Sequence, residues 1–239
     1  MSVTSPQASL QNRLLRALPN EVYERLTPKL RPVQLPRGRV LYDAGDLADC
    51  VYFPLSGVVS LLSSTEAGEV IEVGVVGNEG ITVIPTIGRA REMPYRAVVQ
   101  IPVEAVSIEV GVIRDEFLRG CELRNLLICY MHSLFAQIAQ SAVCNRFHTA
   151  ELRFCRWLLS MHDRVQSDSF ELTHEIISNM LGTQRPLVSV TAGLLQKAGL
   201  ISYSRGSITI LDRQGLEDAS CECYRIVKQQ VTQCLSGFA

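Results

Sequence analysis

The 239-residue sequence predicts an α+β protein, with a β-rich domain in its first half and a helical domain carrying a short hairpin near its end. Three observations predict this. Runs rich in β-branched residues, separated by glycines, extend from Val33 to about Val110. Apolar residues at helical spacing precede and follow these runs. A helix-turn-helix pattern and a hairpin pattern then follow each other between residues 173 and 211.

The chain divides into four predicted parts. Residues 1–32 form N-terminal helices, with Leu14, Leu15 and Leu18 at helical spacing. Residues 33–113 form a β-domain, in which turn glycines recur at intervals of about 8–12 residues or shorter, as in a sandwich or barrel. Residues 114–147 form a long helix, and residues 148–239 form the helical domain with the hairpin.

The long helix carries apolar residues that predict a dimer interface. Leu127, Tyr130 and Leu134 lie on a heptad seam, and Phe135 lies beside it. Such a stripe more often packs on its own domain than on a partner, but a helix with two apolar faces can do both. We therefore expect Leu127, Tyr130 and Leu134 to contact a second copy of the chain.

The run GTQRPLVSV, Gly182 to Val190, lies at the turn of the helix-turn-helix pattern. Gly182 can adopt the left-handed conformation that closes the turn. Pro186 falls in the first turn of the second helix, where its missing N–H leaves no bond unmade. The residues expected to face inward are Ile176, Ile177, Met180 and Leu181 from the first helix, and Leu187 or Val188, Thr191, Leu194 and Leu195 from the second.

Polar residues on the outer face of the second helix predict contacts with DNA bases. Gln184, Arg185 and Ser189 lie near its N-terminus, and arginine and glutamine match guanine and adenine edges in the major groove. Arg205, at the tip of the hairpin that follows, is placed to contact a phosphate. The alternative is a purely structural helical hairpin, which the adjoining β-hairpin and the upstream long helix make less favoured.

Charge and motifs exclude several classes of function. Residues 40–113 hold three Arg and Lys against ten Asp and Glu, so this segment is not expected to lie on a polyanion. The sequence lacks an uninterrupted apolar run of membrane-spanning length and an N-terminal signal sequence, which predicts a cytoplasmic protein without a membrane partner. Catalytic motifs such as GxSxG and HExxH are missing, so the chain is not predicted to be an enzyme and no catalytic residue is assigned.

The eight cysteines and four histidines show no paired metal-ligand spacing. Cys221 and Cys223 form a C-x-C without a second pair nearby, and most cysteines are expected to be small buried hydrophobic residues. His132 and His148 each stand alone on the long helix or at its end. We therefore predict no metal site and no cofactor.

The order of parts resembles the Crp/Fnr transcription regulators, the family of the cyclic-AMP receptor protein. The stretches that carry the resemblance are LPRGRVLYDAGD, VYFPLSGVVSLL, GVVGNEG, YRAVVQIP and the helix-turn-helix, which extend over about residues 35–211. The resemblance implies a jelly-roll sensor domain like the cyclic-nucleotide-binding domain, a dimerisation helix and a winged helix-turn-helix. It also implies a homodimer that reads near-palindromic double-stranded DNA through residues 184–197, with RNA polymerase as a further partner.

The family's cyclic-nucleotide contacts transfer only in part. Glu79 fits the glutamate that meets the ribose, but the arginine-serine pair that holds the cyclic phosphate is replaced by Tyr95 and Arg96. Arg96 is displaced by one residue, which on a strand directs its side chain to the opposite face. We expect Glu79 and Arg96 to be the effector contacts and an effector other than cyclic AMP, or none. The alternative function is a small-molecule or redox sensor whose DNA binding is secondary.

Overall fold

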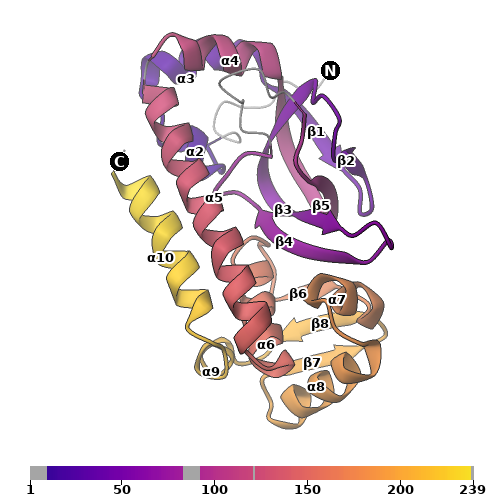
Figure 1. Ribbon diagram of the computed structural model, residues 1–239. Helices are drawn as coiled ribbons and strands as arrows, with labels where there is room; N and C mark the ends of the chain where they lie inside the picture. The colour runs from indigo at the N-terminus through magenta and orange to yellow at the C-terminus, as the bar shows by residue number, and fades with distance from the viewer. Residues whose placement is uncertain (1–9, 83–91, 121, 238–239) are drawn as a thin grey trace.

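The computed structural model describes residues 10–82, 92–120 and 122–237. A curved β-sheet with short helices at its edge forms one end of the molecule, and a helical domain with a small sheet forms the other (Figure 1). Helix α5 (Glu122–Phe147) runs beside both ends and connects them.

The N-terminal part is built from short helices and five antiparallel strands. These elements are α2 (Arg13–Arg16), α3 (Asn20–Leu26), the 3-10 helix η1 (Thr27–Lys29), β1 (Arg31–Leu35), β2 (Val40–Tyr42), β3 (Cys50–Ser64), β4 (Val70–Val76) and β5 (Arg96–Glu109). Asn12 begins α2: its side-chain oxygen accepts hydrogen bonds from the amides of Leu14 and Leu15. Its amide nitrogen donates to the carbonyls of Pro54 and Gly80, which fixes the helix to the sheet.

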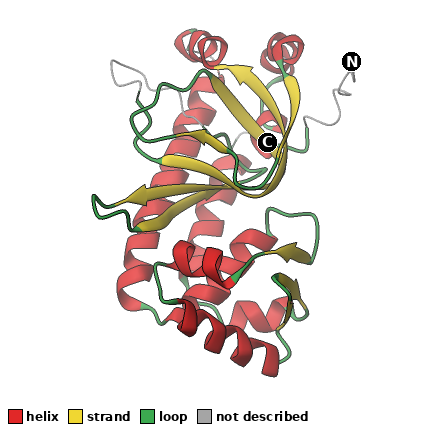
Figure 2. Ribbon diagram, turned by 90° about the vertical axis from the view of Figure 1, so that its right-hand side faces the viewer, coloured by secondary structure: helices red, strands yellow, loops and turns green. Residues whose placement is uncertain are grey.

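The sheet has the strand order β1-β5-β3-β4, with β2 also paired to β5. The two long strands β3 and β5 curve (Figure 2), and their register shifts around Gly57. Gly57 has a φ of +85°, and a Cβ at this position would lie 2.1 Å from the carbonyl oxygen of Pro102. Only glycine fits there, because the backbone itself would block any side chain. The β-domain predicted from the sequence is thus confirmed.

The predicted helix 114–147 is two helices in the structure. Helix α4 (Val110–Leu118) ends before Gly120, which has a φ of +75°, and α5 starts at Glu122. A left-handed glycine cannot continue a right-handed helix, so the chain turns at this point. The long connecting helix is therefore shorter than expected at its N-terminal end.

Helix α5 is the one helix among the described residues that is long and apolar enough to span a membrane by length and composition. It packs instead on the β-sheet, where the side-chain oxygen of Gln137 accepts a hydrogen bond of 2.5 Å from the amide of Val75. Helix α10 also lies along it (Figure 1). These contacts are those of a core helix in a globular fold.

The C-terminal part contains five helices and three strands in the described residues. They are α6 (Ala150–His162), β6 (Ser169–Glu171), α7 (His174–Leu181), α8 (Arg185–Lys197), β7 (Ile201–Ser204), β8 (Ser207–Ile210), α9 (Arg213–Asp218) and α10 (Cys223–Ser236). The strands form an antiparallel sheet in the order β6-β8-β7. The apolar faces of α6, α7 and α8 meet over this sheet around the buried side chains of Phe154, Ile177 and Ile208.

Buried polar contacts join the two ends of the molecule. The indole of Trp157 in α6 donates a hydrogen bond of 2.8 Å to Glu72 in β4. Arg164, just after α6, forms a buried ion pair of 2.8 Å with Glu79, which follows β4. The helical domain is therefore docked against the sheet in this structure.

Candidate nucleic-acid interface

Helices α7 and α8 form the predicted helix-turn-helix. The hydroxyl of Thr173 accepts a hydrogen bond of 3.3 Å from the amide of Ile176 and so caps the start of α7. Gly182 ends α7 in the left-handed conformation, with a φ of 56°. The amide of Thr183 then donates to the carbonyl of Ser178 over 3.0 Å, and this closes the turn.

Helix α8 begins one residue before the proline. Gln184 is its N-terminal cap residue with extended geometry, Arg185 is the first helical residue, and Pro186 is the second. The amides of Leu187 and Val188 donate to the carbonyl of Gln184, so the first turn is complete without a proline N–H. The interpretation of Pro186 as a first-turn residue is confirmed by this geometry.

The inward face of α8 agrees with the expected one except at Leu194. Val188, Thr191, Ala192 and Leu195 are buried, whereas Leu187 and Leu194 are 45% and 51% exposed. The expectation that Leu194 faces the core was therefore wrong, and of the pair Leu187 and Val188 it is Val188 that does. Packing on α6 and α7 fixed the rotation of the helix about its axis, which the apolar pattern alone had not fixed.

The predicted base-reading residues lie on the surface of α8. Gln184, Arg185 and Ser189 are all exposed. The hydroxyl of Ser189, however, lies 2.8 Å from Nδ1 of His174 in α7 and also donates to the carbonyl of Arg185. The polar contacts of Ser189 are thus made within its own domain, while Gln184 and Arg185 point into solvent at the start of the helix.

His174 of α7 contacts both α8 and strand β7 of the hairpin that follows α8. Its ring stacks on Tyr203 of β7, with the ring centroids 4.4 Å apart. Burial lowers the pKa of His174, and the positive charge of Arg185 lowers it further. The imidazole is therefore neutral at neutral pH, which suits its contact with the Ser189 hydroxyl and its position beside an arginine.

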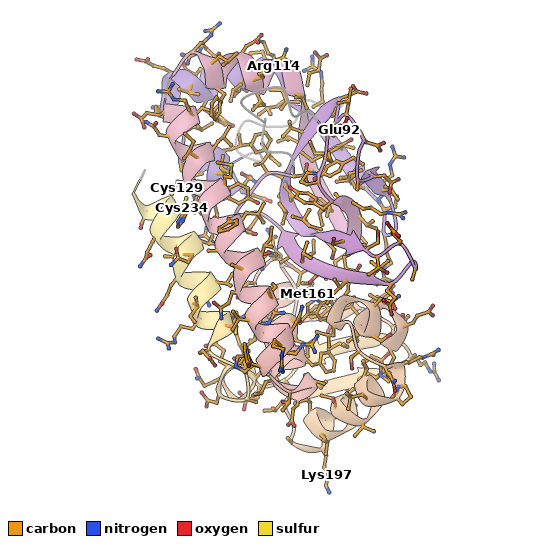
Figure 3. The ribbon with its side chains drawn as sticks, in the orientation of Figure 1. Glu92, Arg114, Cys129, Met161, Lys197 and Cys234 are labelled. Carbon is orange, nitrogen blue, oxygen red and sulfur yellow. The ribbon has the colours of Figure 1, made fainter. Side chains whose placement is uncertain are left out.

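The hairpin expected after α8 is formed by β7 and β8. Arg205 and Gly206 make its two-residue turn, with φ angles of 50° and 80°. Two consecutive positive φ values are typical of the type I′ turn, which matches the twist of a two-stranded ribbon. The side chain of Arg205 is exposed at this tip. Lys197, at the end of α8, also projects into solvent (Figure 3).

The structure does not bring the two expected effector contacts together. Glu79 is buried, accepts hydrogen bonds from Nε and an Nη atom of Arg164, and also accepts one from the amide of Gly77. Arg96 is half-exposed at the start of β5 and pairs with Asp43 over 3.2 Å. Glu79 here joins the two ends of the molecule, a role that its sequence position did not predict.

The three residues expected at a dimer interface lie in the core of their own chain. Leu127, Tyr130 and Leu134 are 0%, 3% and 6% exposed and pack under the β-sheet. A different face of α5 carries exposed apolar side chains. These are Ile128, Met131, Phe135, Val143 and Phe147, which we call the α5 stripe.

Two sets of residues escaped the sequence reasoning. The α5 stripe repeats every three or four residues for most of its length, but the buried face of the same helix has the same period, so the two could not be told apart. Cys144, His148, Cys221 and Cys223 come together in space from two distant segments. Cys144 and His148 are four residues apart, a spacing that places both side chains on one face of a helix and is the one local signal of this group.

An exposed helix-turn-helix followed by a β-hairpin is typical of DNA-binding transcription regulators. Residues 32–119 match the family model of the cyclic nucleotide-binding domain, and residues 152–219 match that of the Crp-like helix-turn-helix domain. The chain belongs to the Crp/Fnr family of transcription regulators.

Comparison with individual proteins agrees with this family. The chain is 27% identical over 217 residues to the global nitrogen regulator of Synechocystis, covering 85% of this chain and 94% of that protein. A regulator of the Crp/Fnr family from Eubacterium rectale has a similar fold, with a TM-score of 0.65 and 19% identity over 86% of this chain and 96% of its own. FixK2 from Bradyrhizobium japonicum gives the same TM-score with 15% identity, covering 80% of this chain and 98% of its own.

Proposed function

We propose that this regulator binds DNA as a homodimer and reads a near-palindromic site through the N-terminal turn of α8. The observation that carries the proposal is the exposure of Gln184 and Arg185 at the start of α8, on the same domain as the exposed tip residue Arg205. Gln184 and Arg185 are suited to base edges, and Arg205 to a phosphate. In a dimer the two helices would lie about 34–36 Å apart, one helical turn of DNA.

The test of this function is binding to genomic DNA fragments with and without unrelated competitor DNA. Sequence-specific binding should survive an excess of competitor and enrich fragments with two related half-sites. Affinity that depends on salt but not on sequence would contradict the proposal, because it would report phosphate contacts alone.

The α5 stripe supports the dimer. Its five large apolar side chains lie on one helix of the protein and are between 43% and 73% exposed. A contiguous exposed apolar surface on a helix is typical of an interface with another chain. In the proposed dimer the second copy covers this surface and excludes water from it. The buried residues Leu127, Tyr130 and Leu134 then contribute to the dimer only indirectly, because they pack α5 against its own β-sheet.

The effector, if there is one, is proposed to be a ligand other than cyclic AMP. Glu79 is already paired with Arg164, and Arg96 with Asp43. A cyclic nucleotide would have to break the buried pair to reach the Glu79 carboxylate. Calorimetric titration with cyclic AMP should therefore show no binding, whereas tight binding accompanied by stronger DNA binding would overturn this part of the proposal.

The remaining partners follow from the same proposal. We place the protein in the cytoplasm, with RNA polymerase as a further partner and without a membrane partner or an enzymatic activity. The domain limits are proposed as 1–32 for the N-terminal helices, 33–113 for the sensor, 114–147 for the dimerisation segment and 148–239 for the DNA-binding domain.

A second candidate function, a metal or redox sensor, is favoured by the grouping of Cys144, His148, Cys221 and Cys223.

A further inference from the structure

Four side chains from two distant segments meet beside the C-terminal end of α5. Cys144 and His148 come from α5 and the residue after it, Cys221 comes from the segment that joins α9 to α10, and Cys223 is the first residue of α10. Their sulfur and nitrogen atoms all lie within 4.8 Å of one another. All three thiols are buried.

Two of the distances between these atoms match the edges of a tetrahedral metal site. A zinc ion with bonds of about 2.3 Å to sulfur and 2.05 Å to nitrogen sets sulfur–sulfur edges of about 3.8 Å and sulfur–nitrogen edges of about 3.5 Å. The Sγ atoms of Cys144 and Cys221 are 3.6 Å apart. Sγ of Cys223 and Nδ1 of His148 are 3.4 Å apart. Both distances are close to the edges of one ZnS₃N tetrahedron.

The surrounding contacts are those that hold ligands in place. Nε2 of His148 lies 3.4 Å from a carboxylate oxygen of Glu222, so the ring can donate from Nε2 and keep Nδ1 free for a metal. The amide of Gln140 donates to the Cys223 sulfur over 3.1 Å. Such outer contacts orient metal ligands and make them better donors.

The charges nearby suit three thiolates. Zinc with three thiolates and a neutral imidazole carries a net charge of −1. Arg153 and Arg156 of α6 both interact electrostatically with Cys144. Their positive charges offset the charge of the site, which would otherwise be costly to bury.

We propose that Cys144, His148, Cys221 and Cys223 bind one zinc ion. Three thiolates and an imidazole in a tetrahedron favour zinc among the common divalent ions. A multi-iron cluster is less suited, because it holds its ligands on different iron atoms and needs them farther apart. The ion ties the end of α5 to the segment between α9 and α10, at the junction of the connecting helix and the DNA-binding domain.

The other pair of neighbouring cysteines provides no such site. Cys129 of α5 and Cys234 of α10 face each other where the two helices pack (Figure 3). The metal-ligand group found among the described residues does not include them. The proposal is therefore restricted to the four residues at the end of α5.

The first experiment measures metal content in the full-length protein purified under reducing conditions without chelators. Elemental analysis should find about one zinc per chain, and exchange with Co²⁺ should give the visible bands of a tetrahedral ion and the near-ultraviolet bands of cobalt–thiolate bonds. Cys223→Ser and His148→Asn should lose most of the zinc. Cys50→Ser changes a partly exposed thiol in β3 and is the matched control, which should retain it.

A third site variant keeps the test decisive if loss of a ligand prevents folding. The Glu222 side chain is 56% exposed, so Glu222→Ala should fold. It should weaken zinc affinity by about 10–100-fold in competition with a chelator, as loss of such an outer partner does elsewhere. Three results would overturn the proposal: no zinc uptake by the reduced protein, unchanged zinc in all three site variants, or an iron–sulfur chromophore in place of zinc.

Discussion

Arg185 combines the features that base recognition requires of a residue. It is the first helical residue of α8, it is exposed, and its guanidinium can form two hydrogen bonds with guanine. Val190 is a further exposed residue of the same helix, one that can contact only a thymine methyl group or other apolar atoms. We therefore expect the specificity of DNA binding to depend mainly on the first turn of α8.

Replacing Arg185 and Arg205 should have different effects on DNA binding. Arg185→Ala should cost about 1–3 kcal/mol on the preferred site and relax the preference at one base pair in each half-site. Arg205→Ala should weaken binding to all sequences alike and reduce the salt dependence by about one phosphate contact. Titrations against a set of single-base variants of the site, at two salt concentrations, measure both. Equal losses on every sequence for Arg185→Ala would contradict its role in base reading.

Glu72 should make stability depend on pH. Burial raises the pKa of its carboxyl from 4.5 to about 7, against the lowering effect of the hydrogen bonds from Ser60 and Trp157 and the charges of Arg156 and Arg164. The folded state therefore holds the proton more tightly than the unfolded state. This contribution is present below about pH 4.5 and is lost as the pH rises through about 7, by an amount on the order of 3 kcal/mol.

Urea unfolding of the wild type and Glu72→Gln at pH values between about 5 and 8 measures this dependence. The glutamine oxygen can still accept from Trp157, and its NH2 group can donate to the Ser60 hydroxyl, but the side chain cannot ionise, so the stability of this variant should fall less steeply over this range. Glu69→Gln, at an exposed position in the turn before β4, should behave as the wild type does. If the free energy of unfolding changed with pH in the same way for the wild type and Glu72→Gln, the raised pKa of Glu72 would not be the cause of the pH dependence.

At the scale of single elements, α5 serves two surfaces at once. One face supports the β-sheet through residues such as Leu127 and Leu134, and another carries the α5 stripe. The helix has apolar residues around most of its circumference, as is typical of a helix that is covered on several sides. Within one chain only part of this surface is covered, and the proposed dimer covers the remainder.

Phe135→Glu should dissociate the proposed dimer. Phe135 is 69% exposed near the middle of the α5 stripe, so the substitution should leave the fold of one chain intact while placing two carboxylates in the interface. Sedimentation or light scattering should show that the dissociation constant of the dimer rises by at least about 10-fold, so that monomer predominates. Leu118→Glu, at a residue of α4 that is 64% exposed and lies outside the stripe, is the matched control. A dimer that withstands Phe135→Glu would place the interface elsewhere.

At the scale of the whole molecule, polar contacts hold the DNA-binding domain on the sensor sheet. Besides the Trp157–Glu72 hydrogen bond and the Arg164–Glu79 ion pair, Arg37 pairs with Glu171 of β6 over 3.5 Å. Ile71 of β4 packs against Gly182, at the turn before α8. The turn of the helix-turn-helix thus contacts the β-sheet directly, which connects the β-domain physically to the helix-turn-helix.

The Arg164–Glu79 pair should be strongly coupled in stability measurements. Glu79→Gln leaves a buried arginine without its counter-charge and should lower the free energy of unfolding by about 3–5 kcal/mol. The double variant Glu79→Gln with Arg164→Met should lose less than the sum of the two single losses, because it leaves no uncompensated charge. A double-mutant cycle in urea tests this, and additive losses would mean that the two side chains do not interact in solution.

The fold class could be predicted from the sequence alone, as could the helix-turn-helix and its left-handed glycine, because these depend on local periodicity and on backbone conformations that few residues adopt. The sequence also placed Gln184, Arg185 and Arg205 on the surface, since capping and turn geometry fix those positions within a few residues. Only the tertiary structure decided which face of α5 is buried, since both faces have the same period. It alone joined Glu79 to Arg164 and gathered four metal-ligand side chains at the end of α5. Those contacts connect residues about 70–85 positions apart in the chain. The spacing of residues within one helix or strand does not indicate which residues so far apart will meet.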